Sequence, residues 1–131
     1  MSETIVQSVY FAASPAQLYS IYLTEKKHAA AINGPASIKP KVGGTFSAFN
    51  MLSGKFLELQ KNKLIVQTWR SKSWKKSERD STLILRFEKY RKGSRIELVH
   101  AHVPEYDFFD IQLGWEKYYW VPLRKYLKNE K

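Results

Sequence analysis

The amino-acid sequence predicts an α+β fold: a curved antiparallel sheet of about six to seven strands, two short helices after the first strand, and a long C-terminal helix packed across the sheet. Residues 107–128 carry the only long apolar pattern of helical period. Residues 37–103 instead alternate between apolar and polar positions, which is typical of strands. Short loops separate the alternating segments, so neighbouring strands should run antiparallel. The sheet is then the element that can cover the apolar side of the helix.

Local signals predict the first elements. Residues 4–11 alternate and predict a strand. Residues 14–17 combine a capping Ser, a Pro at the first helical position and a Gln three residues after the cap, which predicts a helix start. Residues 24–25 can cap a second short helix, and the Asn-Gly-Pro turn at residues 33–35 must end it.

The alternating region should supply six further strands, each bounded by turn residues. These strands are residues 37–39, 44–50, 54–60, 63–70, 81–90 and 95–103.

The long helix should be one element with a local irregularity. Asp107 and Asp110 near its start, and basic residues in its last turns, suit the helix dipole. Pro122 removes one backbone donor and should bend or loosen the helix near Tyr118, unless the last turn is a separate short piece. The apolar side is broad and should be covered along most of its length. It consists of Phe108, Phe109, Ile111, Leu113, Trp115, Tyr118, Tyr119, Trp120, Leu123, Tyr126 and Leu127.

Two polar residues, Gln112 and Glu116, lie four positions apart inside this apolar side. An unpaired buried carboxylate is costly, so an inward-facing Glu116 needs a cation, a histidine or a wet cavity in front of it. The alternative is a rotated or frayed helix that leaves Glu116 at a rim.

Composition narrows the class of protein. At 131 residues the chain is expected to form one domain, residues 1–131, and with no cysteine it has no disulfide or thiolate nucleophile. No signal-peptide pattern or membrane-spanning apolar run is present, so a cytoplasmic protein is expected. The net charge is +10, and residues 61–95 hold twelve basic and three acidic side chains. An electrostatic partner should therefore approach that region.

Several local strings resemble one known family. They are Phe11-Ala-Ala-Ser-Pro15 with Tyr19, Lys41-Val-Gly-Gly-Thr-Phe46, Ile65-Val-Gln-Thr-Trp-Arg70, Leu98-Val-His-Ala-His-Val-Pro104 and Gly114-Trp-Glu-Lys-Tyr-Tyr-Trp120. The family is named for the activator of heat-shock protein 90 ATPase and is homologous to that co-chaperone's C-terminal domain. The resemblance implies the helix-grip fold of the START-like superfamily. The eukaryotic co-chaperone makes its main chaperone contact through a separate N-terminal domain, for which this chain is expected to have no room.

The histidines are the first candidates for metal binding or catalysis. His100 and His102 should share one face of their strand, where Glu116 or Asp107 could add a carboxylate. Without a third ligand of certain placement, a hydrogen-bonded histidine pair is favoured over a metal site. The START-like resemblance also admits a cyclase or hydrolase using Glu116 and His100 as an acid–base pair. No nucleophile set or phosphate loop supports it, so no catalytic residue, metal or cofactor is assigned.

A cavity between the long helix and the sheet is the main functional hypothesis. Aromatic walls with a few polar tips would suit a small hydrophobic ligand, although a filled aromatic core is the competing interpretation. The expected lining residues are Phe46, Trp69, Leu85, Phe87, Leu98, His100, Gln112, Glu116 and Tyr119.

The basic loop of residues 71–80 is the second candidate. It could bind an acidic protein partner or a chaperone, or it could be a solvated hairpin tip whose tryptophan folds back as a lid. Nucleic acid is disfavoured, because a stacking platform needs more aromatics than this loop offers. The expected contact residues are Lys72, Trp74, Lys75, Lys76 and Arg79.

Overall fold

The structure is a computed structural model that describes residues 2–129. Seven strands form one antiparallel sheet in the order β1-β7-β6-β5-β4-β3-β2. The strands are β1 Ser2–Phe11, β2 Ala36–Ile38, β3 Thr45–Ala48, β4 Leu52–Gln60, β5 Leu64–Ser71, β6 Ser81–Tyr90 and β7 Gly93–Pro104. Strands β2 to β7 are neighbours in chain order, and β1 pairs with β7 at the far edge. The predicted α+β helix-grip architecture is confirmed.

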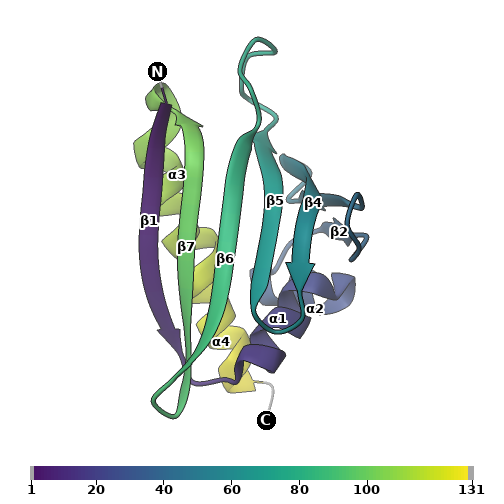
Figure 1. The fold of residues 1–131 in the computed structure, drawn as a ribbon, viewed down its shortest axis with the longest axis vertical. Coiled ribbons are helices and arrows are strands. Elements are labelled where there is room, and N and C mark those ends of the chain that lie inside the picture. The colour runs from purple at the N-terminus through teal and green to yellow at the C-terminus, as the bar shows by residue number, and fades with distance from the viewer. Residues whose placement is uncertain (1, 130–131) are drawn as a thin grey trace.

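The helices lie on one face of this sheet (Figure 1). Helices α1 and α2 lie behind β5 and β4 and cover only the lower part of that face in this view, whereas the C-terminal helical run passes behind β1, β7 and β6. The helical segments are α1 Pro15–Leu23, α2 Glu25–Ile32, the 3-10 turn η1 Glu105–Asp107, α3 Phe108–Gly114, the π-helical segment η2 Trp115–Trp120 and α4 Val121–Asn129.

The start of α1 follows the predicted capping pattern, but the start of α2 does not. The Ser14 hydroxyl accepts a hydrogen bond from the Gln17 amide at 3.1 Å, and Pro15 occupies the first helical turn. Thr24 stands at the N-cap of α2, yet its side chain makes no capping bond. Asn33 ends α2 in the left-handed conformation, with φ 55°, as asparagine can do at little cost.

The predicted loosening before Pro122 is confirmed as the π-helical segment η2. Because Pro122 has no amide hydrogen, the carbonyl of Tyr118 cannot receive the usual i→i−4 bond from that position. The Val121 amide donates to the carbonyl of Glu116, five residues back, which is the π pattern. The helical run therefore continues through Pro122 with one wider turn instead of breaking.

The wider turn changes which residues face the sheet. Ile111, Trp115, Tyr119 and Leu123, spaced four apart, are buried. In a regular α-helix residues four apart drift around the axis, and a wider turn cancels part of that drift. The inward position predicted for Glu116 is wrong, because Ile111 and Trp115 are buried in place of Gln112 and Glu116.

Glu116 and part of the apolar side face solvent. The Glu116 side chain is 59% exposed and lies 3.7 Å from the guanidinium of Arg124. Phe109, Leu113 and Tyr118 are exposed as well, so the helix is covered over a narrower side than the sequence predicted.

Candidate ligand pocket

A pocket of about 400 Å³ lies between the C-terminal helical run, the β3–β4 turn and the end of β5. This volume falls in the lower part of the range usual for small-molecule sites, roughly 300–1,000 Å³. The lining residues are Phe49, Met51, Leu52, Trp69, Ser71, Asp107, Asp110, Ile111, Gly114, Trp115, Tyr118 and Tyr119.

Aromatic rings make up much of the wall. The Trp115 ring centroid lies 4.9 Å from that of Tyr119 and 6.4 Å from that of Trp69. On the opposite side the Phe49 ring packs against Tyr118 at 5.9 Å and Tyr119 at 6.3 Å. These contacts join the two sides of the pocket through side chains alone, and the pocket remains partly open to solvent.

Phe49 reaches the helix because its backbone is left-handed. Phe49 and Asn50 have φ values of 58° and 54° at the centre of the β3–β4 hairpin turn. Tight hairpin turns of this kind require positive φ at both central residues, and they normally carry Asn, Asp or Gly there. A phenylalanine in this conformation costs about 1 kcal/mol or more, which the ring contacts with Tyr118 and Tyr119 offset.

One buried polar group in the wall has no partner. The Trp69 side chain is 4% exposed, and its Nε1 makes no hydrogen bond with any described residue. The indole groups of Trp74, Trp115 and Trp120 all donate to protein acceptors, at 2.7, 3.2 and 2.8 Å. Buried donors in native proteins are nearly always paired, so this unpaired donor is an exception. The nitrogen itself is covered by protein atoms, although Trp69 lines the pocket.

The loop after β5 forms a lid over Trp69. Trp74 is 5% exposed, its ring lies 5.6 Å from that of Trp69, and its Nε1 donates to Asp107 Oδ2 at 2.7 Å. Arg70 holds the loop from within by donating to the carbonyls of Lys75 and Glu78 at 2.6 and 2.7 Å. The lid is therefore docked onto both the sheet and the helix.

His100 stands behind this wall as a neutral ring. Its Nδ1 accepts from Trp115 Nε1 at 3.2 Å, so its Nε2 carries the proton and donates to the Ser81 hydroxyl at 2.8 Å. That hydroxyl donates in turn to the carbonyl of Trp69 at 2.6 Å. Burial lowers the pKa of His100 to about 3. Both ring nitrogens are thus occupied within the protein.

His28 forms a second buried network that the sequence did not reveal as a site. Its Nδ1 donates to the carbonyl of Tyr22 at 2.7 Å, and its Nε2 accepts from the Tyr119 hydroxyl at 2.8 Å. Burial lowers the pKa of His28 to about 4, against the opposing effect of the Tyr22 hydrogen bond. His28, Ala31 and Ile32 have the i, i+3, i+4 spacing of one buried helix stripe, and that spacing could have placed His28 inside.

Comparison with known proteins agrees with this architecture. Residues 12–128 match the family model described as "Activator of Hsp90 ATPase homolog 1-like protein". The chain belongs to this family. The human activator of 90 kDa heat shock protein ATPase homolog 1 is 28% identical over 116 residues, which are 88% of this chain and 34% of the human protein. An uncharacterised protein of Schizosaccharomyces pombe is 39% identical over 71 residues, covering 53% of this chain and 21% of that protein.

Solved structures show the same fold. A crystal structure of an HSP90 activator from Plasmodium falciparum superposes with a TM-score of 0.84 at 23% identity, covering 98% of this chain and 96% of that one. The chain thus spans about a third of the human relative but nearly the whole of the Plasmodium chain. Within residues 2–129, no helix has the length and hydropathy needed to cross a bilayer.

The predicted lining residues of this family member divide into four groups. Trp69 and Tyr119 do line the pocket. The side chains of Phe46, Leu85, Phe87 and Leu98 are packed into the core, and His100 lies behind the wall.

Gln112 and Glu116 do not line the pocket. Gln112 is half-buried, and its backbone carbonyl accepts from Gln7 Nε2 at 3.1 Å. Glu116 faces solvent, so the structure does not bring it together with His100 as an acid–base pair.

His102 also departs from the prediction. It adopts φ 64°, which interrupts the alternation of β7, and Val103 rather than His102 takes the next fully buried position. His102 is half-buried, so the two histidines do not form the buried pair that a continuous strand would give.

The pocket residues that the sequence missed lie mostly outside regular strand positions. Phe49 and Met51 belong to a turn, and Asp107 lies in a 3-10 turn. The alternation within residues 44–50 predicted a strand as far as Asn50 and gave no signal for the left-handed turn at Phe49 and Asn50. Gly114 could have indicated the pocket. A glycine inside a strongly apolar helix costs about 1 kcal/mol, so its presence suggests that space is needed beside it.

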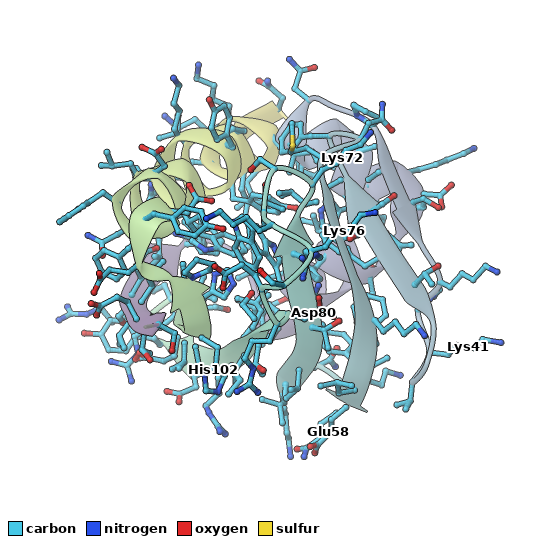
Figure 2. All side chains as sticks on the ribbon, turned by 90° about the horizontal axis from the view of Figure 1, so that it is seen from above. Lys41, Glu58, Lys72, Lys76, Asp80 and His102 are labelled. Carbon is cyan, nitrogen blue, oxygen red and sulfur yellow. The ribbon has the colours of Figure 1, made fainter. Side chains whose placement is uncertain are left out.

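The basic loop presents four of its five predicted contact residues to solvent. Lys72, Lys75, Lys76 and Arg79 are exposed. Figure 2 shows Lys72, Lys76 and Asp80 along this loop, with Lys41 to the right and Glu58 at the bottom of the view. Trp74 is buried as part of the lid, so its assignment as a surface contact is wrong.

Proposed function

We propose that this family member is a non-enzymatic binding module whose aromatic pocket takes a small hydrophobic ligand. The observation that carries the proposal is the 400 Å³ pocket whose wall includes the rings of Trp69, Trp115 and Tyr119. The apolar body of a ligand would contact these rings.

Gly114 supports this use of the space. It lines the pocket with helical φ and ψ of −62° and −34°, a conformation that alanine adopts freely. A Cβ at Gly114 would meet only Tyr118, at an ordinary contact distance of 3.5 Å. The glycine is therefore not required by backbone strain or close packing. It leaves this part of the pocket wall without a side chain.

A neutral fluorescent probe, N-phenyl-1-naphthylamine, tests the proposal. We expect saturable binding, with shifts of the Trp69 and Trp115 indole resonances larger than those of Trp74 and Trp120, which are not among the lining residues. Gly114→Leu should abolish binding by filling the pocket, while Gly114→Ala, the matched control, should bind the probe and remain folded. Binding that is unchanged by Gly114→Leu would refute the pocket as the site.

A second function, contact with an acidic protein surface of a heat-shock protein 90 chaperone, is favoured by the docked basic loop and by the family. Arg70 fixes the loop backbone, so Lys75 and Lys76 are presented on a firm support. The Plasmodium falciparum chain, 96% of which is covered by the superposition, is described as an HSP90 activator.

Charge reversal tests this second function. Lys75→Glu with Lys76→Glu should weaken binding to the purified chaperone most at low salt, since exposed charges are screened over about 10 Å at 0.1 M salt. Lys41→Glu with Lys55→Glu provides the same charge change on exposed residues outside the loop. Equal loss in both double variants would contradict a specific role of the loop.

A further inference from the structure

The rim of the pocket carries two acidic side chains in a strongly basic protein. The chain has 22 Lys and Arg residues against 12 Asp and Glu residues. Arginines are nevertheless paired with Asp80 and Glu88 elsewhere. Asp107 and Asp110 line the pocket and form no ion pair with any residue in the described part of the chain. Among the described residues, several other acidic side chains also lack an ion pair, but Asp107 and Asp110 are the two that line the pocket.

Both carboxylates have free acceptor capacity. Asp107 Oδ2 receives the Trp74 indole, and no other hydrogen bond of the Asp107 carboxylate is formed within residues 2–129. Asp110 is exposed and its side chain makes no hydrogen bond there. Asp107 stands at the N-cap of α3 and Asp110 lies in its first turn, so the two residues lie at the same end of this helix.

The rings below this rim suit a positive charge. Phe49, Trp69, Trp115, Tyr118 and Tyr119 all line the pocket. Aromatic faces attract ammonium groups, more strongly where water is excluded, and tryptophan is the best of them. The Lys117 ammonium already lies 5.3 Å from the Tyr118 ring.

We infer that the ligand of this pocket is an organic cation: a protonated amine attached to an apolar ring or short chain. The inference rests on the proposed binding function and adds the charge of the ligand. The amine lies between Asp110, the free oxygen of Asp107 and the rim rings, and the apolar body fills the space toward Trp69. The protein's net positive charge opposes approach at long range, so selectivity for the cation comes from these local groups.

Three probes with the same ring system test the sign of the charge. They are 1-naphthylmethylamine, 1-naphthalenemethanol and 1-naphthoate, measured by calorimetry in low-salt buffer at pH 7. The amine should bind about tenfold more tightly than the alcohol, and the carboxylate should bind most weakly. Added salt should reduce the preference for the amine and leave the alcohol unchanged.

Substitutions locate the effect. Asp110→Asn should weaken amine binding about three- to tenfold and leave alcohol binding unchanged. Asp107→Asn should act in the same direction, since the asparagine oxygen still accepts from Trp74 and keeps the lid docked. Glu116→Gln is the matched control, because it makes the same charge change on the same helical run outside the pocket.

The outcomes separate the two proposals. If the alcohol binds as tightly as the amine, the cation inference is overturned and the hydrophobic pocket stands. If Glu116→Gln weakens amine binding as much as Asp110→Asn does, the preference reflects overall charge, and the inference is likewise overturned. If none of the three probes binds, the proposed function fails for ligands of this size, and the inference fails with it.

Discussion

Mild acid should destabilise this protein through two buried histidines. The pKa of His28 is lowered to about 4 and that of His100 to about 3, both chiefly by burial. In the unfolded chain each ring has a pKa near 6.5. Between these limits the unfolded state binds two more protons than the folded state, so the free energy of unfolding falls as the pH is lowered. The stabilisation is complete above about pH 6.5 and is lost progressively toward the folded-state pKa values.

The magnitude follows from these values. One proton per pH unit corresponds to about 1.4 kcal/mol, so two histidines give a limiting slope of about 2.7 kcal/mol per pH unit. From pH 7 to pH 5, titration of the unfolded rings costs roughly 3–4 kcal/mol. That is a large part of the 5–15 kcal/mol by which domains are usually stable.

Urea unfolding at pH 7, 6 and 5, followed by tryptophan fluorescence, measures this loss. The m-value should stay constant while the midpoint falls. His100→Gln should lower stability at pH 7 but show about half the loss on acidification, because only His28 remains to take up a proton. His102→Gln is the control, since His102 is half-buried and belongs to neither network. A stability that is flat from pH 7 to pH 5, or an NMR titration of either buried ring near pH 6.5, would refute the reasoning.

Three further substitutions test individual contacts by urea unfolding at pH 7. Ser14→Ala removes the hydroxyl that caps α1 and should cost about 1 kcal/mol, whereas Ser14→Asp should not. Tyr22→Phe removes the hydroxyl that donates to the fully buried Gln67 and should cost about 1–3 kcal/mol without opening a cavity; no loss would mean that water satisfies the amide. Trp74→Phe keeps a ring on the lid but loses the bond to Asp107 and should cost about 1 kcal/mol, and an unchanged midpoint would show that the lid is not docked.

The sheet was predictable because its signals are local. Each strand shows alternation over several residues, and each hairpin has turn residues at its ends, so strand order follows from chain order. Strand β6 was predicted with its exact limits, Ser81–Tyr90. The first helix likewise carries its own cap at Ser14.

The pocket was only partly predictable because it depends on exceptions to those local patterns. Alternation along a strand cannot show that His102 turns left-handed, or that Phe49 holds a positive φ to reach the helix. The charge of the loop around Trp74 suggested that this loop faces a partner. The Trp74 indole instead donates to Asp107, more than thirty residues later in the chain. Such a contact between distant segments exists only once the sheet has formed.

Pro122 links the sequence to the pocket most directly. Because Pro122 lacks an amide hydrogen, the helix adopts the π pattern in which the Val121 amide donates to the carbonyl of Glu116. That wider turn keeps Trp115 and Tyr119 on one side of the helix. Both rings face the sheet, and together with Trp69 they form the inner wall. The same rotation turns Glu116 outward, so the carboxylates left at the pocket belong to the start of the helix, before the π segment begins. A local defect in hydrogen bonding thus decides both the aromatic lining and the position of the acidic rim.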